Sequence, residues 1–244
     1  MRTIGIDMRE KQGDSAIPHD RNQRKGRLAP IEDVVRAIRD GAMVVLVDDE
    51  DRENEGDLII AAEKITSESV NFMITHGKGL LCMPMSAERA AELDLPPMVA
   101  RNEDDFGTAF TISCDANASH GVTTGISASD RAITISLGAK GGSADDFHRP
   151  GHVFPLIARD GGTLTRVGHT EAGVDLARMA GLAPVAAIIE IVGEDGEMLR
   201  FPDLIEWCAE HGLLMTTIEC LREYRRKQID AGVSIDRNLD GVTF

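Results

Sequence analysis

The fold of this chain is decided by residues 42–62, which read AMVVLVDDEDRENEGDLIIAA. The two ends of this stretch, residues 42–47 and 58–62, are continuous apolar runs of strand length, and the first contains three valines. Between them, residues 48–57 carry seven carboxylates, and Gly56 gives the chain a place to turn sharply. The pattern therefore predicts two buried strands joined by an acidic loop at one end of a sheet.

The acidic loop at residues 48–57 is the first candidate binding site. Carboxylates this close together raise one another's pKa values unless a cation lies among them. Oxygen ligands with a single arginine, Arg52, suit a hard divalent ion such as Mg²⁺. A solvated acidic loop is the alternative interpretation, since charge runs often only solvate a surface. The apolar strands on either side favour the cation site.

Composition limits the class of protein. With 244 residues and 42% hydrophobic content, the chain can form one large domain or two small ones. The formal charge of −15 argues against a nucleic-acid partner, although one or two arginines can still hold a small phosphate ester. No run approaches the ~20 apolar residues of a membrane helix, and the polar start lacks a signal region. Four scattered cysteines fit reduced thiols, so we expect a cytoplasmic protein that does not bind membranes.

Apolar periodicity and turn residues predict the secondary structure. Helices are expected at 30–40, 67–77, 87–93, 128–137 and 171–180, the last with Thr170 as its N-terminal cap. Further strands are expected at 80–83, 109–114, 153–158 and 184–192, and a helix, a strand and a helix over 202–228. Residues 138–152 are rich in glycine and charge and are expected to form a long loop.

Strands and helices alternate irregularly along the chain. We therefore predict an α/β (α+β) fold: a three-layer α-β-α sandwich with a mixed, twisted sheet in a single domain. This domain is expected to span residues 29–228. A flexible N-terminal arm is expected at 1–28 and a C-terminal tail at 229–244.

Three later segments complement the acidic loop: residues 148–152 (HRPGH), residues 165–170 (TRVGHT) and Glu190. Glu190 lies in an apolar run, where burying a carboxylate is costly unless it is paired, protonated or near a metal, and such a group suits proton transfer. Thr170 and the free amides of a helix start can accept a phosphate, with Arg166 adding charge. The alternatives are surface histidines, an edge glutamate and a simple helix cap.

Four motifs together carry a family resemblance. They are residues 48–57, GVTTG at 121–125, RPGHVFPL at 149–156 and GHTEA at 168–172. In this order they resemble the 3,4-dihydroxy-2-butanone 4-phosphate synthase family of riboflavin biosynthesis, from about Ile31 to Tyr224. Four long motifs in sequence are far more specific than any one of them.

The resemblance implies a magnesium-dependent lyase that converts D-ribulose 5-phosphate into 3,4-dihydroxy-2-butanone 4-phosphate and formate. It implies a homodimer that holds one or two Mg²⁺ ions, with Mn²⁺ as a substitute. Glu53 and His169 resemble the metal ligands, and His152 and Glu190 the residues of proton transfer, with Glu55 as a further candidate. The residues that resemble substrate contacts are Arg52, Glu53, Asp57, Arg166, Val167, Gly168, His169, Thr170 and Glu190.

Two rival functions fit part of the pattern. One is another magnesium-dependent sugar-phosphate lyase or isomerase, and the other is a non-catalytic binding protein; the joint presence of His152, His169 and Glu190 disfavours the second. Some members of the family continue into a GTP cyclohydrolase II domain. This chain lacks the clustered zinc cysteines of that domain, so we expect a single activity.

Overall fold

The computed structural model describes residues 28–232. The segments expected as an arm and a tail lie outside the described residues, except for residue 28 and residues 229–232. Within residues 28–232, no helix is long and apolar enough to cross a membrane.

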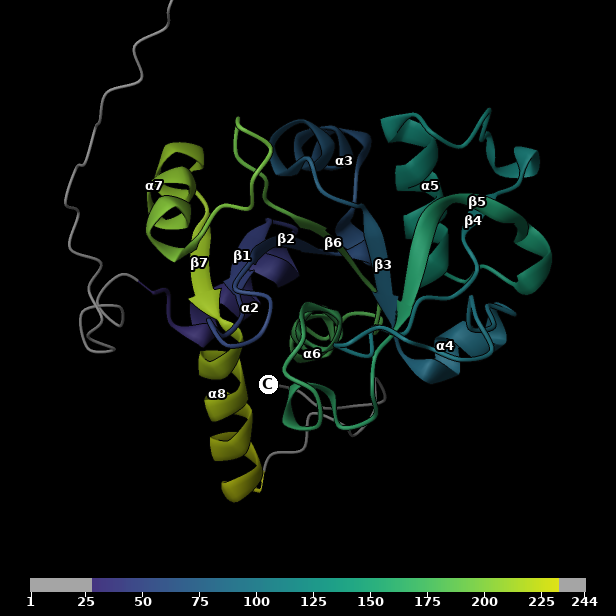
Figure 1. Ribbon diagram of the computed structural model, residues 1–244. Helices are drawn as coiled ribbons and strands as arrows, with labels where there is room; N and C mark the ends of the chain where they lie inside the picture. Colours follow the sequence, from purple (N-terminus) through teal and green to yellow (C-terminus); the bar gives the residue numbers. More distant parts are fainter. Residues whose placement is uncertain (1–27, 233–244) are drawn as a thin grey trace, which may run out of the picture.

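A seven-stranded mixed sheet forms the middle layer, in the order β4-β5-β3-β6-β2-β1-β7 (Figure 1). Parallel pairs join β1 to β7 and β3 to β5, and the other neighbours are antiparallel. The predicted mixed sheet in a single domain is confirmed. The strands are β1 (Val44–Val47), β2 (Gly56–Ala61), β3 (Cys82–Met85), β4 (Cys114–Ala116), β5 (Phe147–Ile157), β6 (Ala186–Glu190) and β7 (Leu214–Thr217).

Helices cover both faces of the sheet, because successive strand residues point to opposite sides. In β1, Val44 and Leu46 join one core cluster, while Val45 and Val47 join the other. The first cluster is completed by α2 (Ile31–Asp40), α6 (His169–Met179) and α8 (Ile218–Asp230). The second is completed by α3 (Ser67–Phe72), α4 (Ala87–Glu92), α5 (Ala128–Ala139) and α7 (Phe201–His211). The three-layer prediction is thereby confirmed (Figure 1).

Several predicted boundaries shift. Residues 147–152 belong to β5 rather than to a loop, because their backbone lies along β4. The strand expected at 109–114 shrinks to β4, preceded by isolated bridges from Phe110 and Thr111. Residues 73–77 continue α3 as a π-helical turn rather than as regular helix.

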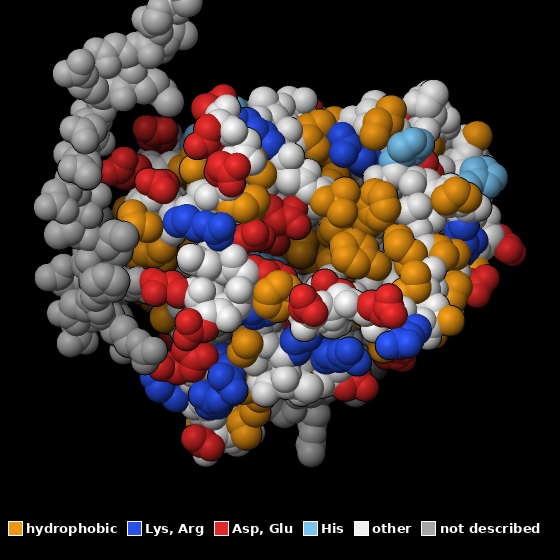
Figure 2. Space-filling view, in the orientation of Figure 1, with side chains coloured by type: hydrophobic (Ala, Val, Ile, Leu, Met, Phe, Trp, Pro, Cys, Tyr) orange, Lys and Arg blue, Asp and Glu red, His pale blue; other side chains and the backbone are white. Residues whose placement is uncertain are grey.

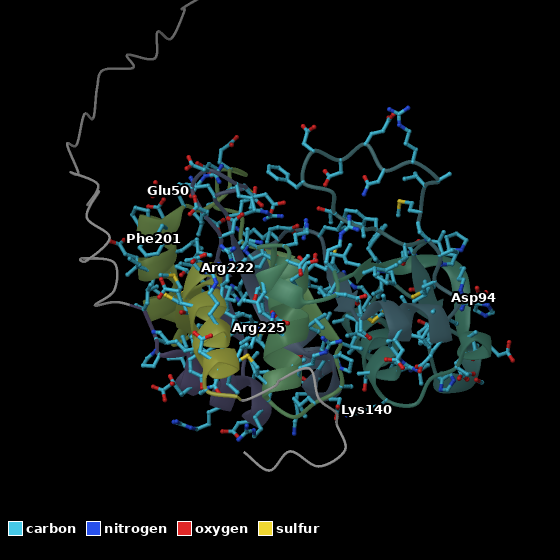
Figure 3. All side chains as sticks on the ribbon, turned by 90° about the horizontal axis from the view of Figure 1, so that it is seen from below. Glu50, Asp94, Lys140, Phe201, Arg222 and Arg225 are labelled. Carbon is cyan, nitrogen blue, oxygen red and sulfur yellow. The ribbon has the colours of Figure 1, made fainter. Side chains whose placement is uncertain are left out.

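The layer formed by α2, α6 and α8 contains a fully buried ion pair. The guanidinium of Arg225 in α8 donates to Asp175 in α6 over 2.7 Å, and both side chains are 0% exposed. Asp175 also accepts from the backbone N–H and the hydroxyl of Thr163, in the turn that precedes α6. Figure 3 labels Arg225 where α8 faces α6. The pair therefore fixes the position of α6 relative to α8.

Arg225→Met should lower the free energy of unfolding by about 3–5 kcal/mol, because it leaves the Asp175 carboxylate buried without its cation. The neighbouring Arg226 is 48% exposed and lies 3.6 Å from Glu219, so Arg226→Met is a matched control. It should change stability by no more than about 0.5 kcal/mol. Urea denaturation followed by circular dichroism measures both, and equal effects would contradict this role of the pair.

Candidate metal and active site

The acidic loop closes an antiparallel hairpin in which Val47 of β1 pairs with Gly56 of β2. Asp48 follows β1 directly and is only 7% exposed. Its carboxylate accepts the backbone N–H groups of Glu53 (3.0 Å) and Glu55 (2.8 Å). The guanidinium of Arg52 donates to it as well, over 2.9 Å. Asp48 therefore organises the loop, a role that nothing in the sequence distinguished from its six acidic neighbours.

The loop meets His169, the first residue of α6, at the end of β1 and β2. The Nδ1 atom of His169 lies 3.6 Å from Oε2 of Glu53 and 3.7 Å from Oδ1 of Asp57. On the other side of the ring, Nε2 is 3.2 Å from the carbonyl oxygen of Leu46. A hydrogen bond there would leave Nδ1 as the ligand nitrogen, an arrangement common at metal sites. Asp48, Glu53 and His169 offer ligand atoms that all lie within 4.8 Å of one another.

The charges of this group are strongly coupled. Burial, together with the carboxylates of Glu190, Glu53 and Glu55, outweighs His169 and raises the pKa of Asp57 to about 8. Burial disfavours the charged form of His169, but the carboxylates of Asp57 and Glu53 outweigh it and raise the pKa to about 9. For Glu53, burial is outweighed by His169 and Arg52, which lower the pKa to about 2. Among residues 28–232, Asp57 Oδ1 is a buried oxygen without a hydrogen-bond partner.

Glu190 lies beside this group, because it pairs with Asp57 across β6 and β2. Its carboxylate accepts the backbone N–H of Leu80 over 2.8 Å. A Cβ at Gly79 would collide with the same carboxylate, so the close approach requires glycine. Glu190 is the last residue of β6 and its side chain is partly exposed, which lies between the buried carboxylate and the edge glutamate that the sequence left open. It is therefore accessible from the same end of the sheet as Asp57.

His152 lies on β5, two strands away from Glu190. The register places Cys82 of β3 opposite both Phe154 of β5 and Ile188 of β6. If this pairing is followed two residues further, Leu80 of the segment before β3 lies between His152 and Glu190. Two strand spacings separate their backbones by roughly 10 Å. His152 is 45% exposed and contacts Asp115 rather than a member of the acidic group.

The segment from Arg166 to Thr170 leads into α6. Gly168 is the N-terminal cap and the helix begins at His169, so the expectation that Thr170 caps the helix is wrong. Thr170 is instead buried in the first turn, and Val167 packs against the core cluster that includes α2, α6 and α8. Because Gly168 has no side chain, no side-chain cap covers the first backbone N–H groups of α6.

Arg166 is held from two sides. Its guanidinium donates to Glu171 over 2.6 Å and to the Thr108 hydroxyl over 3.1 Å, and its Nε donates to the Phe106 carbonyl. Glu171 is 1% exposed and also accepts the backbone N–H of Arg159 over 2.9 Å. The ring of Phe106 also lies 5.2 Å from the guanidinium carbon of Arg52. The segment 106–108 therefore bridges both arginines of the site.

Figure 2 shows acidic side chains gathered beside a contiguous apolar patch on one face of the molecule. Large apolar side chains exposed by more than a third are present in the described part of the chain. They are Leu80, Met98, Val99, Phe106, Ile126, Leu214 and Ile229. Leu80 adjoins Glu190 directly through its backbone, so apolar surface reaches the edge of the candidate site.

A sequence profile of 3,4-dihydroxy-2-butanone 4-phosphate synthase matches residues 32–224. The chain belongs to this family. Two curated relatives are each 54% identical to it over 199 residues. They are the riboflavin biosynthesis protein RibBA of Aquifex aeolicus and the 3,4-dihydroxy-2-butanone 4-phosphate synthase of Pseudomonas aeruginosa. The match covers 81% of this chain, and 49% and 54% of those proteins. The chain thus spans about half the length of the curated relatives it matches.

A solved structure of a 3,4-dihydroxy-2-butanone 4-phosphate synthase in complex with two magnesium ions resembles the chain throughout the described fold. The TM-score is 0.79 at 45% identity, over 83% of this chain and 99% of that one. Family membership and the α/β fold expected from the four motifs are thus confirmed. The roles of individual residues stay predictions.

Asp48→Ala should weaken the affinity for Mn²⁺ by about tenfold or more, because the backbone of Glu53 loses its anchor. The two N–H groups left without an acceptor should also lower the free energy of unfolding by about 1–3 kcal/mol. Asp51→Ala, at an exposed position of the same loop, is the control and should change neither quantity. Calorimetric titration and urea denaturation measure the two effects, and an unchanged affinity in Asp48→Ala would refute the anchoring role.

Proposed function

We propose that this protein converts D-ribulose 5-phosphate into 3,4-dihydroxy-2-butanone 4-phosphate and formate, as a magnesium-dependent lyase of riboflavin biosynthesis. The observation that supports this most is the meeting of Glu53 and Asp57 with His169, with Glu190 paired to Asp57 on the next strand, in a chain of this family. The reaction comprises enolisation, dehydration, rearrangement of the carbon skeleton and loss of formate.

The donor set fits a divalent cation. Glu53 and His169 would be the ligands, with Asp48 within reach and beside them Oδ1 of Asp57, which accepts no hydrogen bond from the described residues. Carboxylates and one imidazole suit Mg²⁺, and Mn²⁺ accepts the same ligands. Two ions can be held, as in the related structure. When bound, the metal would polarise adjacent sugar oxygens and stabilise the negative charge of an enediolate.

The substrate phosphate would bind near Arg166 and Thr170. Arg166 has a guanidinium already oriented by Glu171 and Thr108, so little conformational entropy is lost on binding. The first turn of α6 provides backbone N–H groups and the positive end of the helix dipole. Arg52 and Asp57 would contact the sugar beside the metal ligands.

Proton transfer would fall to Glu190 and His152, which lie at the same end of the sheet on either side of β3. Glu190 is held by the Leu80 N–H yet remains accessible. Glu55 is a further candidate: burial, then the neighbouring Glu53 and Glu190, raise its pKa from the usual range. Enolisation and dehydration each need a base and an acid, and several groups close together meet that demand.

The active form would be a homodimer. Apolar side chains exposed on the face of the site, Leu80 among them, are what a subunit interface buries. The acidic net charge still argues against a nucleic-acid partner, so the only other partner proposed is the small sugar phosphate. Sedimentation equilibrium tests the dimer.

Wild-type protein with Mg²⁺ should release formate from ribulose 5-phosphate, and chelation should abolish it. Glu53→Gln should lower this rate by about 100-fold or more, because a metal ligand loses its charge. Asp51→Asn, at an exposed position of the loop, should retain the rate. Formate is measured with a coupled formate dehydrogenase. Turnover of ribulose 5-phosphate without formate would favour another sugar-phosphate lyase or isomerase instead.

Glu190→Gln should lower kcat by about 100-fold while KM changes little, because the amide still accepts the Leu80 N–H but cannot take up a proton. Glu194→Gln is the control, since that side chain is 96% exposed and pairs with Lys78. Steady-state formate release measures both. A normal kcat in Glu190→Gln would exclude Glu190 as the proton-transfer group.

A further inference from the structure

Asp115 in β4 is a largely buried acid, and both of its carboxylate oxygens contact His152. Its Oδ1 accepts the backbone N–H of His152 over 2.8 Å, and its Oδ2 lies 2.7 Å from Nδ1 of the same histidine. The Asp115 side chain is 12% exposed, against 45% for His152. The contact therefore fixes both the backbone and the ring of a residue that otherwise reaches into solvent.

The strand pairing brings this contact about. Cys114 pairs with Val153, but the next residue, Asp115, pairs with His148, so the register shifts between them. Residues 149–152 of β5 therefore form a bulge between these two pairs, with no paired residue on β4. A Cβ at Gly151 would collide with the backbone of β4, and its N–H donates to Ser113 over 3.1 Å. Such irregularities re-aim side chains next to functional sites.

The GVTTG motif at 121–125 covers the pair. A Cβ at Gly125 would come within 2.7 Å of His152 Nδ1 and would collide with the Asp115 carboxylate. Gly125 also has a φ of 91°, which glycine adopts readily. Asp130, at 3% exposure, holds this turn by accepting from the N–H groups of Thr123 and Gly125 and from the Thr123 hydroxyl. The turn therefore closes over Nδ1, whose hydrogen-bond partner within residues 28–232 is the Asp115 carboxylate.

We propose that Asp115 is a positioning residue that keeps the proton of neutral His152 on Nδ1, so that Nε2 is the nitrogen that exchanges a proton with the substrate. This inference rests on the proposed function of His152. A carboxylate accepts but cannot donate, so it selects the Nδ1–H tautomer. When Nε2 takes a proton from substrate carbon or oxygen, the Asp115 carboxylate stabilises the imidazolium until the proton returns to a leaving oxygen.

Asp115→Asn tests the proposal, because the amide keeps the size of the side chain but can donate to Nδ1 as well as accept. The kcat for formate release should fall about 100-fold, while KM for ribulose 5-phosphate and the affinity for Mn²⁺ stay within about twofold. In ¹⁵N spectra of histidine-labelled protein, wild-type His152 should show the Nδ1–H tautomer, and the variant a mixture. His152→Gln assigns the signal.

Asp146→Asn is the matched control. Asp146 makes the same kind of contact, 2.8 Å from Nε2 of His120, outside the proposed site. This variant should keep wild-type kcat and leave the His152 signal unchanged. In a His152→Gln background, Asp115→Asn should add no further loss of kcat, because the partner it positions is gone.

An Nε2–H tautomer of His152 in the wild-type protein would overturn the proposal, and this measurement needs no turnover. A loss of kcat in Asp115→Asn with the tautomer unchanged would equally overturn it, since Asp115 would then act on structure alone. If the wild-type protein releases no formate, the proposed function fails, and the spectra alone decide whether Asp115 positions the ring.

Discussion

The burial of His169 among carboxylates at the end of the β1–β2 hairpin is the interaction on which the site depends. The ring can lie there only if α6 packs across β1 and β2, and the buried pair of Arg225 and Asp175 holds that helix. The acidic loop can approach the ring only because Asp48 gathers its backbone N–H groups. The contact of His169 with the carboxylates therefore requires both the position of α6 and the shape of the acidic loop.

The same contact explains the electrostatics. Burial drives Asp57 towards its neutral form, and the neighbouring carboxylates add to this effect. At Glu53 and His169, groups of opposite charge outweigh burial and favour the charged forms. Carboxylates remain in excess of cationic groups, which is the condition in which a divalent ion stabilises a site instead of competing with it. The fit to a metal follows from this excess of charge and from Oδ1 of Asp57, which accepts no hydrogen bond within residues 28–232.

Acids that organise other groups recur through the site. Asp48 holds a loop, Glu171 holds Arg166, Asp130 holds the turn at 123–125 and Asp115 holds His152. Each is buried or nearly so and accepts two or more hydrogen bonds. Their arrangement places the chemistry on side chains whose geometry is fixed before substrate binds, as precise positioning of reacting groups requires.

The sequence by itself determined the two strands around the acidic loop, the three-layer sandwich and the family, because apolar periodicity and long motifs are local properties of the chain. It did not give the start of α6, the partial exposure of Glu190 or the strand at 147–152. Those depend on which backbone groups find partners elsewhere. The family resemblance already paired Glu53 with His169, but only the tertiary structure separated Asp48 and Asp115 from the other acids, because contacts between residues far apart in sequence exist only after the sheet and α6 have packed.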